Sequence, residues 1–368
     1  MEQNIIYIYM NTINDKINNI FQETDTWGTV YVTKNGKSIF EKYYGYTDYK
    51  NGKKWNNRSQ HRIMSVTKFF TALTIMILYD KNKLDIDETI DNYGLEEIPN
   101  SDIITIKNIM EHKSGLDDDT WYLDWDKGRK FNKKTHIQKS HTREELFNKI
   151  KNSVPKYKPG EQNLYSNSGY YLLGYIIEYV TNKKPHLVIK KLIIDNLNLN
   201  DTTFMGLKLK NPVYPYTYNR KLGGISQLNI DHTAGSIISS VKDLSYLLDN
   251  YDKLLQKKTV KLFNNIYRNN YLYKKYKKYS YPAFKKKNKI YNPLWVMGAG
   301  DNDGITNKSG CCITETYCIK IIEHNIVFML FWNHTNLPKN KFLINGINRK
   351  IRDIIMTKLF DFEKIGKW

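Results

Sequence analysis

The sequence contains little cysteine and little proline for its length. Three of its 368 residues are cysteines, Cys311, Cys312 and Cys318, and all three lie within eight positions of one another. Cysteines this close in sequence rarely pair without strain, so no disulfide framework is predicted. Their spacing also matches no second pair of zinc ligands, so neither a metal nor another cofactor is expected. This use of cysteine fits a reducing compartment.

The beginning of the chain lacks the marks of an export signal and of a membrane span. Its first 21 residues, "MEQNIIYIYMNTINDKINNIF", carry Glu2 instead of a basic start, and Asn11 and Asn14 interrupt the apolar run. A signal peptide needs a basic start and an unbroken apolar core, and a spanning helix needs about 20 apolar residues. We therefore expect neither a signal peptide nor a membrane span. This favours an intracellular location, or a virion if the genome is viral, and the compartment itself stays open. Oligomeric state also stays open.

Acidic residues are also scarce, with 37 Asp and Glu against 57 Lys and Arg, giving a net charge of +20. Such a charge attracts polyanions, including nucleic acid. The segment from Arg268 to Lys289, "RNNYLYKKYKKYSYPAFKKKNK", interleaves lysine blocks with tyrosines that are able to stack on bases. The same composition is typical of a solvated insertion in a protein from an AT-rich genome. Both interpretations stay open at this point.

Hydrophobic patterning predicts strands at both ends of the chain and helices between them. Alternation on either side of Asn35-Gly36 indicates a β-hairpin that follows a short helix. Residues 65–80 form an apolar run long enough for a buried helix, and "ITIKNIMEHKSGL" predicts a helix closed by Gly115. Further helices are expected over 143–154, within 165–184 with a start marked by Ser166 to Ser168, and over the C-terminal residues 345–360. A long loop is expected over 117–142, and two strands joined at His324-Asn325. There is no internal repeat.

The buried helix begins with Ser65 and Lys68, which share one helix face at a spacing of three. A helix start stabilises an oxyanion, and a lysine against apolar walls is able to serve as a base. The residues therefore suit acyl transfer. Ser65 equally suits the role of a helix N-cap. The same spacing occurs twice more, at Ser153 and Lys156, where Pro155 disfavours a helix, and at Ser239 and Lys242, where Ser240 and Asp243 resemble a cap.

Two further short motifs contain residues suited to the same chemistry. In "YSNSGY", Tyr165 and Asn167 precede a second buried helix, where a phenol is able to move protons and an amide is able to bind a lysine or a substrate. In "NKSGCC", Lys308 and Ser309 precede the last strands, where a cation is able to hold a carboxylate. Each motif alone fits an ordinary core tyrosine or turn lysine equally well.

Taken in order, "SVTK", "YSN" and "KSG" resemble the motifs of the serine beta-lactamase and penicillin-binding-protein superfamily. The similarity is to its class C-like branch, which includes esterases and D-aminopeptidases. It extends from Trp27 to His334 through "ITIKNIMEHKSGL", "PGEQNLYSNSGYYLLGYIIE", "LNLNDTTF" and "HTAGSIISSVKDLSYLL". The branch often has His-x-Gly or Lys-Thr-Gly at the third motif, so Ser309 is a departure.

The resemblance implies a mixed α/β (α+β) fold in which helices flank an antiparallel sheet. Residues 1–80 and 235–368 would form the sheet domain and 81–234 a mainly helical domain, with the active site in the cleft between them. Ser65 would be the acylated nucleophile, Lys68 its base and Tyr165 the proton carrier. Asn167, Lys308 and Ser309 would bind substrate, and the backbone N–H groups of Ser65 and Cys311 would form the oxyanion hole. The family pattern needs no histidine at His232, so that residue is expected to be structural.

The sequence therefore predicts a serine hydrolase that acts without metal on an amide, β-lactam or ester in a small or peptide-like substrate. Two alternatives stay open. One is a weak or inactive protein of this fold that binds polyanions through Arg268 to Lys289, and the other is a structural protein without turnover. Retention of Ser65, Lys68, Tyr165 and Lys308 favours the enzyme, because a scaffold needs none of them.

Overall fold

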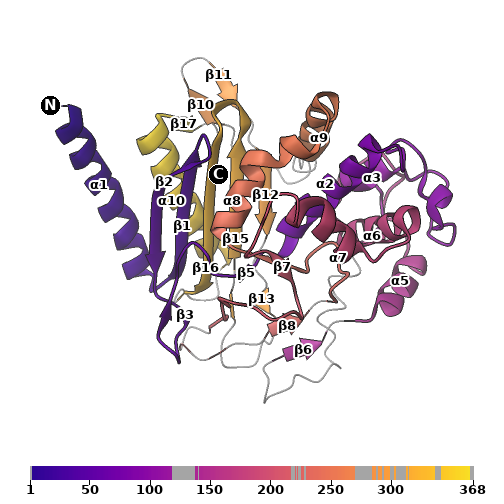
Figure 1. The fold of residues 1–368 in the computed structure, drawn as a ribbon, viewed down its shortest axis with the longest axis horizontal. Helices are drawn as coiled ribbons and strands as arrows, with labels where there is room; N and C mark the ends of the chain where they lie inside the picture. The colour runs from indigo at the N-terminus through magenta and orange to yellow at the C-terminus, as the bar shows by residue number, and fades with distance from the viewer. Residues whose placement is uncertain are drawn as a thin grey trace.

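A computed structural model describes residues 2–117, 137–139, 141–216, 220, 222, 225–227, 229–269, 284–286, 289–291, 294–298, 302–303, 312–313, 315–335 and 341–364. Its centre is an antiparallel sheet of five strands in the order β12 (Leu294–Gly298), β15 (Glu315–Ile321), β16 (Ile326–His334), β1 (Trp27–Lys34) and β2 (Lys37–Tyr44). The two ends of the chain thus share one sheet, as predicted (Figure 1).

Tight turns set the register of this sheet where the sequence predicted them. Asn35 and Gly36 join β1 to β2 with φ of 52° and 73°. Asn325, with φ of 46°, leads into β16 after a single 3-10 turn, η5 (Ile322–His324). Asparagine and glycine adopt such positive φ angles at the lowest cost, so these turns were readable from sequence.

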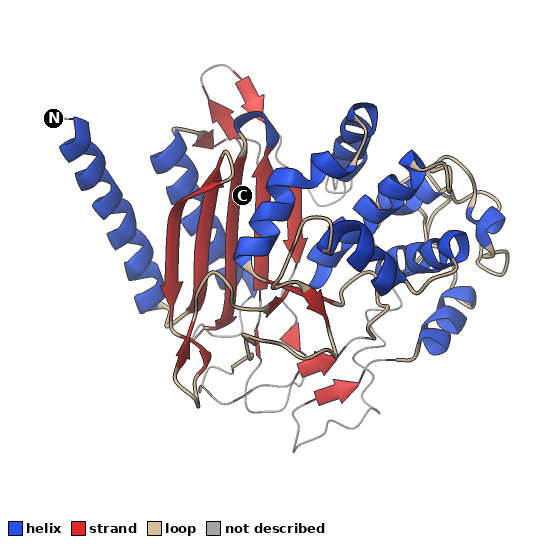
Figure 2. Ribbon diagram, in the orientation of Figure 1, coloured by secondary structure: helices blue, strands red, loops and turns tan. Residues whose placement is uncertain are grey.

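Strand β16 is buried along its whole length because helices cover both faces of the sheet (Figure 2). Phe328, Leu330 and Trp332 point to the face covered by α1 (Glu2–Glu23) and α10 (Lys341–Phe360). Val327, Met329 and Phe331 alternate with them and join the larger core cluster on the other face. Two covered faces explain the unbroken apolar run of this strand.

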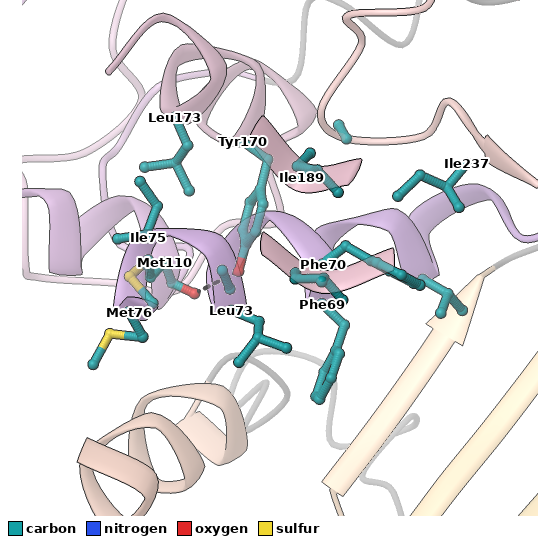
Figure 3. Close-up of a cluster of buried hydrophobic side chains, with 14 of the residues drawn as sticks. Phe69, Phe70, Leu73, Ile75, Met76, Met110, Tyr170, Leu173, Ile189 and Ile237 are labelled. Carbon is teal, nitrogen blue, oxygen red and sulfur yellow. Dashed lines mark hydrogen bonds between the residues drawn. The ribbon is translucent and has the colours of Figure 1, made fainter. Parts of the chain in front are cut away.

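The larger core is built around α2 (Thr67–Asp80), α6 (Asn167–Thr181) and α8 (Val241–Asn250). Every residue of α2 from Thr67 to Leu78 is buried. Figure 3 shows Phe69, Leu73 and Met76 of α2 beside Tyr170 of α6. The Tyr170 hydroxyl donates a 3.0 Å hydrogen bond to the Met110 carbonyl, which satisfies the polar end of this buried ring.

Most of the remaining elements are short. The helices are α3 (Ile106–Met110), α5 (Arg143–Lys151), α7 (Pro185–Ile189), the π-helical η3 (Lys190–Ile194) and α9 (Lys257–Asn269), with 3-10 turns η1 (Met64–Val66), η2 (Ile90–Tyr93) and η4 (Tyr251–Leu254). The strands are β3 (Tyr46–Asp48), β4 (Lys53–Lys54), β5 (His61–Arg62), β6 (Ile137–Lys139), β7 (Thr203–Phe204), β8 (Ile225–Gln227), β9 (Ile237–Ser239), β10 (Phe284–Lys286), β11 (Lys289–Tyr291), β13 (Asn302–Asp303), β14 (Cys312–Ile313) and β17 (Glu363–Lys364).

Several sequence predictions need correction. The N-terminal helix is not short, since α1 has 22 residues. Helix α3 ends at Met110 instead of reaching Gly115, because His112 has a φ of 55° that no α-helix continues through. Most of the expected loop over 117–142 lies outside the described residues, although β6 within it pairs with β8. The division into domains at residues 80 and 235 stays a prediction. Where the chain is described, none of its helices is both long and apolar enough to cross a membrane.

Candidate active site

Ser65 does not cap the helix that it precedes. It lies in η1, one residue before Val66, and Val66 occupies the N-cap position of α2 without a side-chain capping bond. The preceding residue, Met64, has a φ of 45°, a strained conformation for a long side chain. The N-cap interpretation is therefore wrong for Ser65, and its hydroxyl is engaged elsewhere.

The Ser65 hydroxyl contacts two groups suited to moving its proton. Its Oγ lies 2.6 Å from the Tyr165 hydroxyl, and the Lys68 Nζ donates to it over 3.1 Å. Tyr165 is 100 residues away in sequence, so only the tertiary fold joins these residues. The arrangement places a serine hydroxyl within hydrogen-bond reach of two groups able to carry a proton, a geometry that suits an activated serine.

Lys68 is 1% exposed, although its amine is a strongly hydrated group in water. Besides Ser65, its Nζ donates to Asn167 Oδ1 over 2.6 Å and to the Ala234 carbonyl over 3.0 Å. The Tyr165 ring centroid lies 4.8 Å from the same nitrogen. Three acceptors and a ring face replace the lost water and fix the amine beside Ser65.

Local sequence positions Tyr165 and Asn167 at the start of α6. Ser166 is the N-cap, and its Oγ accepts a 3.1 Å bond from the Gly169 N–H. Asn167 is therefore the first helical residue, and Tyr165 directly precedes the N-cap. The expected helix start around Ser166 is confirmed, and the helix tied to it delivers both side chains to Lys68.

Thr233 ties α2 and α6 together behind the site. The Thr71 hydroxyl donates to the Thr233 carbonyl over 2.6 Å, and the Thr233 hydroxyl donates to the Tyr170 carbonyl over 2.8 Å. The next residue along the chain is Ala234, whose carbonyl accepts from Lys68. The segment around Thr233 therefore positions an acceptor of the Lys68 amine.

Two buried histidines lie near Lys68. His232 is 4% exposed, and burial together with the Lys68 charge lowers its pKa to about 4. It packs against Tyr171 at 5.3 Å between ring centroids, and its Nδ1 has no hydrogen-bond partner among the described residues. His112 is not among the residues predicted from the sequence. It is 2% exposed, and its ring lies 4.6 Å from that of Tyr165. No local pattern in "EHKSGL" indicates that pairing.

The two other Ser-x-x-Lys copies have structural roles. The Ser153 hydroxyl donates to the Ile150 carbonyl over 2.8 Å at the end of α5. Ser239 is fully buried and its Oγ lies 2.9 Å from that of Thr202. Ser240 caps α8 by accepting from the Asp243 N–H, as its sequence predicted.

Part of the predicted site lies outside the described residues. These are Lys308, Ser309 and Cys311, together with most of the basic segment from Arg268 to Lys289. Their expected roles stay predictions. Among the described residues, no group of three His, Cys, Asp or Glu side chains is arranged to hold a metal ion.

Comparison with known proteins gives one family match. A family model described as Beta-lactamase matches residues 18–349. "Protein flp" of Staphylococcus aureus is 26% identical over 256 residues, which cover 65% of this chain and 49% of that protein. The chain thus spans about half the length of this relative.

Solved structures share the fold at low sequence identity. A penicillin-binding protein from Bacillus halodurans superposes with a TM-score of 0.67 at 16% identity, covering 90% of this chain and 98% of that one. A D-amino acid amidase from Ochrobactrum anthropi SV3 gives a TM-score of 0.69 at 17% identity, covering 94% and 99%. At such identities the likeness concerns the fold.

Proposed function

The chain belongs to the beta-lactamase family and has its mixed α/β fold, and from this premise we propose that it is a serine hydrolase acylated on Ser65. The family resemblance and the fold class expected from the ordered motifs are confirmed by the family match. The substrate class we propose is an amide, β-lactam or ester, the class expected from the sequence.

One observation supports the proposal above the others. Ser65 Oγ lies within 2.6 Å of the Tyr165 hydroxyl and 3.1 Å of the Lys68 Nζ, while Lys68 itself is buried. A serine that merely caps a helix needs neither contact. A nucleophile needs both a place for its proton and a nearby positive charge to stabilise the alkoxide that forms.

Acylation follows from these contacts. Ser65 Oγ attacks the substrate carbonyl carbon and passes its proton to the Tyr165 oxygen, which reacts as a phenolate beside the Lys68 ammonium. The tetrahedral oxyanion then collapses, the bond to the leaving group breaks, and Tyr165 donates a proton to that group. This leaves an ester on Ser65. The Lys68 ammonium is held by Asn167 and the Ala234 carbonyl. It stabilises the negative charge that the Ser65 and Tyr165 side-chain oxygens carry during the transfer.

Deacylation uses the same groups in reverse. Water attacks the ester carbonyl while Tyr165 accepts its proton, and the proton returns to Ser65 Oγ when the acid departs. Asn167 also has an amide N–H₂ group, which is suited to contact a substrate amide as the family resemblance implies. The proposal includes substrate binding by Lys308 and Ser309, and an oxyanion hole that uses the backbone N–H of Cys311.

A substrate panel tests the proposed reaction. Nitrocefin, short-chain p-nitrophenyl esters and D-amino-acid p-nitroanilides would be assayed with the native chain and with Ser65→Ala, Lys68→Met and Ser239→Ala. We expect at least one compound class to be hydrolysed, with a loss of about 10³-fold or more for the first two variants. Ser239 belongs to another copy of the Ser-x-x-Lys spacing, so Ser239→Ala should keep the native rate. Equal activity in Ser65→Ala would overturn the proposal.

A further inference from the structure

His112 contacts the chain on both sides of Tyr165. Its carbonyl accepts a 2.8 Å bond from the Leu164 N–H, and its Nδ1 accepts a 3.2 Å bond from the Ser166 N–H. Its ring packs against the Tyr165 ring at 4.6 Å between centroids, tilted by 35°. One residue thus binds the backbone before and after Tyr165 and supports the ring between them.

Tyr165 needs such support because α6 begins after it. Leu164 and Tyr165 lie outside any helix or strand, and Ser166 starts the helix as its N-cap. A phenol has to be held within a few tenths of an ångström to reach Ser65 at 2.6 Å. The contacts of His112 provide this constraint from a different part of the chain.

His112 keeps its own position through a strained backbone and a buried ring. Its φ of 55° turns the chain just after α3, which directs both its carbonyl and its ring toward residues 164–166. The ring also packs against Tyr170 at 5.0 Å. A non-glycine residue in this region is typical of functional sites, where the surrounding structure maintains the strain.

The ring of His112 is neutral in the folded protein. Burial and the nearby Lys68 charge hold its pKa well below 6.5. Neutrality agrees with the hydrogen bond, because Nδ1 accepts from Ser166 only without a proton of its own, which places the ring proton on Nε2. A charged ring would lose that bond.

We propose that His112 is a positioning residue for Tyr165, which holds the phenol oxygen against Ser65 through one ring contact and two backbone hydrogen bonds. The inference rests on the proposed function, in which Tyr165 moves the protons. It adds a residue to the machinery that touches neither substrate nor Ser65. Its loss should lower the rate of acylation and change substrate binding little.

Two substitutions separate the contacts of His112. His112→Asn keeps an acceptor for the Ser166 N–H and tolerates the positive φ, but it removes the ring. His112→Phe keeps a ring and removes the acceptor. Both should lower kcat by about 10- to 100-fold with KM changed less than about threefold, because Tyr165 would be displaced by a fraction of an ångström. His186→Asn serves as the control, since His186 is a histidine that contacts Asp231 instead of the Tyr165 segment. We expect native kinetics for this variant.

A second readout does not depend on turnover. With 3-fluorotyrosine incorporated at Tyr165, the fluorine NMR signal of the folded protein reports the environment of that ring. We expect a shifted or broadened signal in both His112 variants and an unchanged one in His186→Asn. An unchanged signal in both folded His112 variants would overturn the inference. If the native chain proves inactive while the signal moves, the proposed function fails and the positioning role stands.

Discussion

Lys68 is a residue whose amine has exchanged water for protein acceptors, and Asn167 is the acceptor with the shortest bond to it, at 2.6 Å. A hydrogen bond to a charged group contributes more to folding stability than a bond between neutral groups. The reason is that removing one partner leaves a buried charge without its hydrogen bond, which is costly. At the residue scale, Asn167 therefore stabilises the fold as well as the site.

Asn167→Ala should lower the free energy of unfolding by about 1.5–3 kcal/mol, the range for a lost hydrogen bond to a charged group. Asn250→Ala is the matched control, since Asn250 is also buried and its side chain, among the described residues, donates only to the neutral Tyr246 carbonyl. That variant should lose about 1 kcal/mol. Urea denaturation at pH 7 measures both, and equal losses would contradict a charged Lys68.

The buried histidines predict how stability changes with pH. His232 has a folded pKa of about 4 against 6.5 when unfolded, since burial and Lys68 disfavour its charged form. Unfolding below pH 6.5 therefore takes up a proton, so the stabilisation is complete above pH 6.5 and is lost as the pH falls toward 4. His61, lowered by burial to about 3, acts in the same direction.

The size of the effect follows from the pKa difference, at about 1.4 kcal/mol for each pKa unit. His232 should thus account for roughly 3 kcal/mol of lost stability by pH 4. His232→Gln should flatten the curve of unfolding free energy between pH 6.5 and pH 4 relative to the native chain. Parallel curves for the two proteins would show that His232 is not held neutral.

At this scale the sequence predicts which side chains belong to the candidate site better than it predicts which of them contact one another. Ser65 differs from the two other Ser-x-x-Lys serines because it begins a long apolar run and because "YSN" and "KSG" follow it in order. Its contact with Tyr165 spans 100 residues, and no periodicity encodes it. His112 was missed for the same reason, since its role arises from backbone bonds to Leu164 and Ser166 that form only in the fold.

At the scale of elements, the segment around Thr233 packs too closely on α6 for a side chain at Gly174. A Cβ there would lie 2.7 Å from the Thr233 Oγ1 and 2.9 Å from its Cγ2. Thr233 ties α2 to α6 and precedes the carbonyl that accepts from Lys68. Gly174 therefore connects helix packing to the position of the amine.

Gly174→Ala should destabilise the protein by about 1–3 kcal/mol through overpacking, despite the better helix propensity of alanine. It should also lower kcat, because moving Thr233 moves the Ala234 carbonyl. Gly52→Ala is the control, since no atom lies within 4 Å of the added Cβ and only its positive φ opposes the change. Thermal unfolding and the substrate assay check both variants. A stabilised and fully active Gly174→Ala would contradict this account of the packing.

Elements with a local signal were predictable and those without one were not. Asn35-Gly36 and Asn325 need positive φ angles that few residues accept, so their hairpins were readable from the sequence. The end of α3 was not, because His112 adopts a positive φ before Gly115 is reached. Gly115 is needed for another reason, since a Cβ there would lie 2.0 Å from the Tyr157 carbonyl oxygen.

At the scale of the whole molecule, the sheet separates two cores with different tasks. The core on one face includes Ile13, Ile17 and Ile20 of α1 packed with α10 and the sheet. The core on the other face carries α2 and α6 and thus Lys68 and Asn167. This arrangement lets stability and activity be altered separately.

Ile17→Ala, at a fully buried position, should cost about 2–5 kcal/mol of unfolding free energy by leaving a cavity. Its kcat per folded molecule should stay native, because the cavity lies across the sheet from Ser65. Chemical denaturation and the substrate assay below the unfolding temperature measure the two quantities. A large loss of kcat in the folded variant would show that the two cores are coupled.

The central claim is that Ser65 is the acylated nucleophile, and intact-protein mass spectrometry with peptide mapping tests it most directly. The native chain would be treated with a fluorescent penicillin and with a fluorophosphonate. The account predicts one covalent adduct per chain on the Ser65 peptide, absent from Ser65→Ala and retained in Ser153→Ala and Ser239→Ala. Absence of any adduct on the folded native chain with both probes, or an adduct that persists in Ser65→Ala, would contradict it.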